Sequence, residues 1–305
     1  MALKCTWLVH AVPAGRTAED VVQEVVTKQL PTLARLVENG ELLDPIDFID
    51  VFCEHGPSFF NPEHSKKILQ AGKRLLGAQA VFHGDELSDQ NSGKYIKPKC
   101  LQLPSTHSPL PLRPISRHAS ILIRSGLLAE EVSARAVSHL EMLNDQGVAA
   151  MARAGVHAQL LPTTAYLLRL PLPPTRKLIE SGVPVTLASD FNPNAHCWDM
   201  CATMNLGCVL FKMTMPEALV ASTINGASCI DVAHEVGSLE IGKRGDCFIL
   251  DAPTWEHLVY DMRPKVRTHH PPLTLAAFKP ANFRTDRGGV QRRHERNGVV
   301  VESPS

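Results

Sequence analysis

The chain has 305 residues, enough to bury a substantial hydrophobic core in one large α/β domain or two smaller ones. Its 31 Lys and Arg side chains balance its 31 Asp and Glu side chains, so we expect no binding to nucleic acid or to an anionic membrane surface. No apolar run reaches the ~18 residues that a membrane span needs. The eight cysteines are scattered without a C-x-x-C, which predicts reduced thiols in a cytoplasmic protein.

Short apolar runs, which predict strands, alternate with amphipathic stretches, which predict helices, over the first two thirds of the chain. The first strand starts near residue 2 and ends near His10. The helical stretch after it has Thr17 as N-cap, a proline interruption at Pro31 and a stop at Gly40. A second strand starts near residue 46, and the helix after Asn61 leads to a third strand that starts near residue 79.

The third strand, "QAVF", is followed at once by "HGDE", which contains His83, Asp85 and Glu86. In a (β/α)8 barrel the carboxyl ends of the strands are where catalytic residues gather. A capped turn with solvated acids explains the same four residues, so "HGDE" alone leaves both interpretations open.

Three more strand-and-loop units start near residues 134, 157 and 184, which makes six strands. Repeated βα units predict a parallel sheet, open or closed into a barrel, although six strands are too few for a barrel of eight. Two regions break the pattern: residues 88–125 are an irregular insert rich in Pro and Ser, and residues 263–305 are a basic tail that we expect to be disordered.

Polar residues follow four of these apolar runs: His10, His83, His139 and Asp190. A single histidine at a strand end is more often structural than a ligand, but a barrel brings four successive carboxyl ends to one place. Imidazole and carboxylate ligands suit Zn²⁺ or Fe²⁺, and a metal-bound water is a nucleophile for hydrolysis. The segment "SDFNPN" adds Asn192 and the backbone around residue 194, which could hold a substrate carboxylate or amide.

The motifs "FHGDE", "SHLE", "LLPTTAY", "RKLIESGVPVTLASDFNPN", "MTMPEALVASTINGA" and "GSLEIGKRGDCFILDA" resemble the amidohydrolase superfamily and, within it, the imidazolonepropionases. The resemblance covers residues 2–91 and 126–262. It implies hydrolysis of the cyclic C–N bond of 4-imidazolone-5-propanoate to N-formimidoyl-L-glutamate, in L-histidine degradation. It also implies a partial (β/α)8 TIM-type barrel over residues 1–234, a remnant of a small β domain over residues 235–262, and a homodimer.

The same resemblance assigns roles to individual residues. It implies one divalent metal, Zn or Fe, with His83 and Asp190 as ligands, and a small-molecule substrate. Glu86 contacts the substrate ring and carries a proton, while His139 is an acid–base residue near the metal-bound water. Asp190 counts with Glu86 and His139 as catalytic. The substrate-binding residues are His10 (placed on the fourth barrel strand), Glu86, Asn192, Asn194 and Ala195.

The chain departs from the family pattern in one respect that bears on activity. The family's first barrel strand carries a His-x-His that supplies two metal ligands, and none of the 14 histidines here forms a His-x-His. We assign the first strand to the fourth barrel strand, so three strands lack a counterpart. Two ligands hold a divalent metal poorly, and a partial barrel exposes strand edges, so we expect impaired hydrolysis.

Two other functions are consistent with the sequence. A non-catalytic amidohydrolase fragment would act through its unpaired strand edge by binding a partner, for example the full-length enzyme. A different amidohydrolase, such as a deaminase or another cyclic-amide hydrolase, would share the metal ligands and differ in substrate. Metal content and a substrate panel separate these alternatives.

Overall fold

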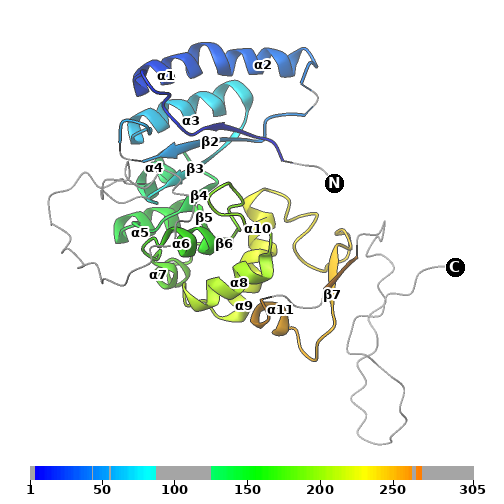
Figure 1. Cartoon of the computed structure of the whole chain (residues 1–305). Helices are drawn as coiled ribbons and strands as arrows, with labels where there is room; N and C mark the ends of the chain where they lie inside the picture. Colours follow the sequence, from blue (N-terminus) through cyan, green and yellow to red (C-terminus); the bar gives the residue numbers. More distant parts are fainter. Residues whose placement is uncertain (1–3, 43, 55, 87–124, 263–265, 270–305) are drawn as a thin grey trace, which may run out of the picture. The chain divides into compact units, whose positions relative to one another are not determined.

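The computed structural model describes residues 4–42, 44–54, 56–86, 125–262 and 266–269 (Figure 1). The chain divides into two compact units, Met1–Ala150 and Met151–Ser305, and each is described by itself. No described helix is long and apolar enough to cross a membrane. The insert expected over residues 88–125 falls almost wholly outside the described residues, as does most of the tail expected over 263–305.

The first unit is built on four parallel strands in the spatial order β1-β2-β3-β4. They are β1 (Thr6–Val9), β2 (Phe48–Cys53), β3 (Gln79–Gly84) and β4 (Ala136–His139). The helices are α1 (Ala18–Glu24), the π-helix η1 (Val25–Gln29), α2 (Leu30–Glu38), α3 (Pro62–Leu76) and α4 (Ser125–Glu131); α5 (Asp145–Ala154) crosses into the second unit.

The helix signals of the first unit are confirmed, with one correction. Thr17 caps α1 through a capping box with Asp20, and Gly40 lies just beyond α2 with φ of 69°. Pro31 does not interrupt the helix, because it lies in the first turn of α2, directly after the π-helical residues. A proline there loses no intrahelical hydrogen bond that a normal first turn would have made. The π-helical residues of η1 join α1 to α2 without a break in the helix.

Helix α3 packs on one face of β2 and β3. Ile49 and Leu69 are fully buried between them, and a Cβ atom added at Gly72 would lie 2.4 Å from Ile49 Cδ1. Because side chains alternate along a strand, the residues on either side of Ile49 and Val51 face away from α3. That second face of β2 carries Asp50 and Phe52, and it bears the candidate site.

The second unit contains the parallel pair β5 (His157–Leu160) and β6 (Val185–Leu187) and the antiparallel pair β7 (Cys247–Leu250) and β8 (Val266–His269). Its helices are α6 (Pro162–Leu168), α7 (Thr175–Glu180), α8 (Met200–Val209), α9 (Met215–Ser222), α10 (Ile224–Cys229) and α11 (His257–Tyr260). Strand β7 lies in the region 235–262 assigned to a small β domain, an assignment that stays a prediction, and its partner β8 lies beyond that region. Strand β8 shows that residues 266–269, within the tail expected to be disordered, have regular structure.

The six predicted parallel strands are all present, and they start at residues 6, 48, 79, 136, 157 and 185. The run "IDFIDVFC", which forms β2, is not at an edge of the sheet, because β2 pairs with both β1 and β3. The described part of the chain thus contains six of the eight parallel strands that a complete barrel needs. The assignment of His10 to the fourth barrel strand stays a prediction.

Candidate active site

Three side chains meet at one face of the first unit. His10 directly follows β1, Asp50 lies within β2, and His83 is the next-to-last residue of β3. The strand register pairs Leu8 with Asp50 and Phe52 with His83. His10 and His83 therefore each lie two residues farther along the chain than the position opposite Asp50, one on each side of β2. Neighbouring parallel strands thus direct all three side chains to one point.

The Asp50 carboxylate bridges the two imidazole rings. Its Oδ2 atom lies 3.1 Å from His10 Nε2, and its two oxygens lie 3.1 and 3.0 Å from His83 Nδ1. Burial alone would raise the pKa of Asp50, which is 4% exposed, but the charge of His83 and the hydrogen bonds with both histidines hold it below its usual value. The carboxylate is therefore ionised and accepts hydrogen bonds.

The donor set of this cluster is one that metal sites use. One ligand atom from each of His10, Asp50 and His83 lies within 4.8 Å of the other two. Two imidazoles and one carboxylate are typical of catalytic zinc and of non-haem iron(II). The rings of His10 and His83 meet edge to face with their centroids 4.7 Å apart. The first unit can therefore contribute ligands to a divalent metal.

A second titratable cluster lies beside the first. His139 Nε2 lies 3.3 Å from Glu86 Oε2, and the His139 ring centroid lies 5.3 Å from that of His83. The backbone N–H of Glu86 donates to Glu54 Oε1 at 2.6 Å. Burial and the nearby His83 hold the pKa of His139 well below its usual value, so its imidazole is neutral and can accept or donate a proton.

The turns at these strand ends are conformationally unusual. Asp85, His139 and Asp190 have φ of 55°, 79° and 50°, in the left-handed region that costs side-chain-bearing residues about 1–3 kcal/mol. Burial and the charge of Glu54 raise the pKa of Asp85 to about 7, although hydrogen bonds with Ser125 oppose this. Such strained turns are common at active sites, where they help to fix the positions of the side chains.

The second unit holds the other predicted residues. Thr164 Oγ1 donates to Asp190 Oδ2 at 2.5 Å, which fixes the carboxylate at the end of the β6 segment. Asn192 serves the loop itself, because its Nδ2 donates to the Asp190 carbonyl and its Oδ1 accepts from the N–H groups of Asn194 and Ala195. Asn194 is exposed, while Ala195 is fully buried.

The structure thus brings the predicted residues together in two groups. His10, His83, Glu86 and His139 form one group in the first unit; Asp190, Asn192, Asn194 and Ala195 form the other in the second unit. The shared metal of His83 and Asp190 stays a proposal. Sequence reasoning missed Asp50, although a carboxylate inside the apolar run "FIDVF" is itself a signal, since such a group needs a partner when buried.

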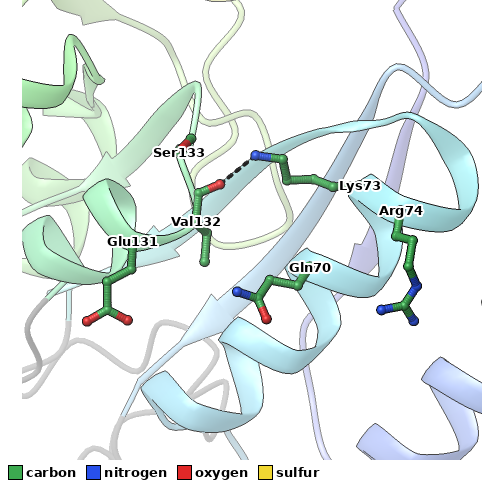
Figure 2. A pocket seen from close by; sticks show the side chains of 6 residues that line it. All are labelled: Gln70, Lys73, Arg74, Glu131, Val132 and Ser133. Carbon is green, nitrogen blue, oxygen red and sulfur yellow. Dashed lines mark hydrogen bonds between the residues drawn. The ribbon is translucent and has the colours of Figure 1, made fainter.

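A separate pocket of about 340 Å³ opens on the first unit, between the end of α3 and the turn before β4 (Figure 2). Lys73 Nζ donates to the Val132 carbonyl at 2.7 Å across it. The pocket lies at the amino ends of β3 and β4, whereas His83 and His139 lie at their carboxyl ends. It is therefore not part of the candidate site.

Comparison with known proteins gives consistent results. The model of the amidohydrolase family matches residues 115–285. The chain is 43% identical over 251 residues to a "Probable imidazolonepropionase" of Bos taurus, covering 82% of this chain and 50% of that protein. It is 47% identical over 253 residues to a protein of the same description from Dictyostelium discoideum, covering 83% and 50%. The chain spans about half the length of the curated relatives it matches.

Solved structures resemble the fold at low sequence identity. An adenosine deaminase from Xanthomonas campestris with bound zinc has a TM-score of 0.57 at 16% identity, covering 82% of this chain and 57% of that one. A guanine deaminase from C. acetobutylicum with bound guanine has a TM-score of 0.54 at 15% identity, covering 78% and 56%. At this identity the likeness shows the fold alone, which is that of a partial (β/α)8 barrel.

Proposed function

This chain belongs to the amidohydrolase family, and from that premise we propose that its site is that of an imidazolonepropionase. The reaction would be hydrolysis of the cyclic C–N bond of 4-imidazolone-5-propanoate to N-formimidoyl-L-glutamate, in cytoplasmic L-histidine degradation. The relatives at 42–47% identity support this substrate, since each carries the name "Probable imidazolonepropionase".

One observation carries the proposal. The rings of His10 and His139 flank His83, with centroids 4.7 and 5.3 Å away, and Glu86 lies 3.3 Å from His139. Three imidazoles and a carboxylate at the ends of three parallel strands exceed what a capped turn requires. Such a set provides metal ligands and acid–base groups together, as metal-assisted hydrolysis demands.

We assign one divalent metal, zinc or iron, to His83 and Asp190. The donor types fit either ion, and Asp50 and Thr164 hold these two side chains in fixed positions by hydrogen bonds. When bound, the ion would polarise the ring carbonyl and lower the pKa of a coordinated water. The remaining chemistry belongs to protein side chains.

Glu86 and His139 manage the proton. Hydrolysis adds a hydroxyl group to the ring carbonyl carbon, breaks the C–N bond and places a proton on the departing nitrogen. Water supplies both parts, so a group near the ring must take its proton and return it. The Glu86 carboxylate takes this role, with neutral His139 sharing the proton across their 3.3 Å contact.

The remaining predicted residues would contact the substrate or support the loop beside it. The His10 side chain is 38% exposed, so its imidazole can contact a substrate while it leans on Asp50. Asn192 supports the loop through the hydrogen bonds described above, and exposed Asn194 is the better placed of the two to reach the product. Ala195 contributes by its position, since its N–H and carbonyl both bond within the loop.

The proposal is tested with the purified chain by following the loss of imidazolone absorbance, alongside a panel of other cyclic amides and of purine and triazine deaminase substrates. With no His-x-His in the sequence, we expect slow ring opening confined to the imidazolone. Faster turnover of another substrate would assign the site to a different amidohydrolase. An inert, metal-free chain would favour a non-catalytic fragment that acts through a partner.

A further inference from the structure

Asp50 is a buried carboxylate that neither binds the metal nor carries a proton in the proposed chemistry. It lies in the middle of β2, is 4% exposed, and contacts one histidine from each neighbouring strand end. A buried carboxylate is costly unless it is paired, and this one is paired twice. We propose that Asp50 is a positioning residue that fixes His10 and His83 in opposite tautomers.

The tautomers follow from which ring nitrogens face the carboxylate. Asp50 faces Nδ1 of His83 and Nε2 of His10. Carboxylate oxygens accept hydrogen bonds, and a neutral imidazole carries its proton on one nitrogen only. The nitrogen facing Asp50 must therefore be the donor, which makes the neutral form of His83 the Nδ1–H tautomer and the neutral form of His10 the Nε2–H tautomer.

The consequence for His83 rests on the proposed function. A histidine binds a metal through the nitrogen that carries the lone pair, and a carboxylate on the other nitrogen fixes ring orientation and raises ligand basicity. With the Nδ1 proton directed at Asp50, the lone pair of His83 is on Nε2. Asp50 then acts on the metal through His83, without ligating it.

Packing holds the rings against this carboxylate. Phe52, two residues beyond Asp50 on the same face of β2, lies 6.0 Å from the His10 ring centroid and 5.9 Å from that of His83. The two histidine rings also contact each other edge to face. Movement of either ring out of its plane would give up these contacts, so packing keeps each ring beside Asp50, and the hydrogen bond to the carboxylate selects the tautomer.

The first experiment needs no metal. Long-range ¹⁵N–¹H correlation spectra of the metal-free full chain, labelled at histidine, report which nitrogen of each ring is protonated. Signals are assigned by their loss in His83→Gln and His10→Gln. We expect His83 as the Nδ1–H form and His10 as the Nε2–H form in the wild type and in the control Asp47→Asn. Asp47 directly precedes β2, and its side chain pairs with Lys4 rather than with a histidine.

Asp50→Asn should shift both rings to mixed tautomers, and Asp50→Glu, which keeps the carboxylate, should recover part of the preference. Circular dichroism shows whether each variant is folded, and if Asp50→Asn is not, the wild-type and Asp50→Glu spectra still decide the matter. An Nε2–H form of His83 in the wild type, or unchanged tautomers in folded Asp50→Asn, would overturn the proposal.

The second experiment is a zinc titration of the same variants. Asp50→Asn should weaken binding about 10–100-fold while the stoichiometry at saturation is unchanged, the effect of losing a ligand's hydrogen-bond partner. His10→Gln should change affinity far less than His83→Gln. Equal losses in His10→Gln and His83→Gln would place the ion directly on His10, Asp50 and His83, and overturn the positioning role. A wild type that takes up no zinc would reject the proposed function, and the tautomer result would still stand.

Discussion

His139 Nε2 lies 3.3 Å from Glu86 Oε2, with both side chains almost fully buried. Burial keeps the pKa of His139 well below its usual value, so this is a neutral imidazole against a carboxyl group rather than an exposed ion pair. A proton shared between two such groups stays out of reach of bulk water. The contact joins the carboxyl end of β4 to the segment after β3, at the candidate site.

Glu86→Gln should lower ring opening about 10²–10⁴-fold, the usual range for an acid–base group, because an amide keeps the shape but cannot accept the proton. Bound metal should be unaffected. The comparison is made in any form of the protein with measurable turnover, using kcat and elemental analysis. Glu63→Gln, on the exposed first turn of α3, is the matched control. Full activity in Glu86→Gln would reduce Glu86 to a structural residue.

Glu86 and His139 should also behave as one unit. If they share a single proton, His139→Gln in the Glu86→Gln background should cost much less than it costs alone, because groups that act together have non-additive effects. The four values of kcat form a double-mutant cycle. Independent, multiplicative losses would mean that the 3.3 Å contact is not used in turnover.

Gly72→Ala should destabilise the first unit by about 1–3 kcal/mol, since its Cβ would overlap the Ile49 side chain and force β2 away from α3. Asp50 is the next residue along β2, so metal affinity should fall as well. Urea unfolding measures the first effect and a zinc titration the second. Gly226→Ala in α10, where the nearest atom is 3.6 Å away, should be neutral or slightly stabilising. Equal stability of the two variants would contradict this packing.

Glu217 gives a pH dependence in the second unit. Burial alone would raise its pKa, but hydrogen bonds from Arg176 and Thr214 and the charge of Arg176 lower it below its usual 4.5. A lowered folded-state pKa contributes stability that is present above about pH 4.5 and is lost as the pH falls through the folded value. Glu217→Gln should therefore destabilise the chain at pH 6.5, and the difference in urea midpoint should shrink below pH 4. Glu180 also pairs with Arg176 but is exposed, so Glu180→Gln should change neither the stability at pH 6.5 nor its pH dependence by much.

The sequence predicted well where one residue type and one local rule decide the structure. Asn61, after which a helix was predicted, caps α3 by accepting from the His64 N–H, and Gly40, the predicted stop, lies just beyond α2 with φ of 69°. The place of His83 at the end of β3 follows in the same way from an apolar run that stops. These features depend on residues within a few positions of one another.

Long-range pairing decided what the sequence did not. The role of Asp50 depends on β1 and β3 lying on either side of β2, and nothing local to "IDFIDVFC" states that order. The predicted interruption at Pro31 was wrong because proline breaks a helix interior, whereas Pro31 lies in the first turn of α2, directly after the π-helical residues. Strand neighbours and winding changes are properties of the packed chain.

The central claim is that His83 and Asp190 hold one divalent metal. The most direct test is equilibrium dialysis of residues 1–305 against zinc, with elemental analysis, for the wild type, His83→Ala, Asp190→Ala and the exposed control His234→Ala. We predict weak but saturable uptake of one zinc per chain by the wild type and the control. In each ligand variant the zinc affinity should fall by more than the ~10–100-fold that is typical when a ligand loses its hydrogen-bond partner. Unchanged zinc uptake in both His83→Ala and Asp190→Ala would contradict the account.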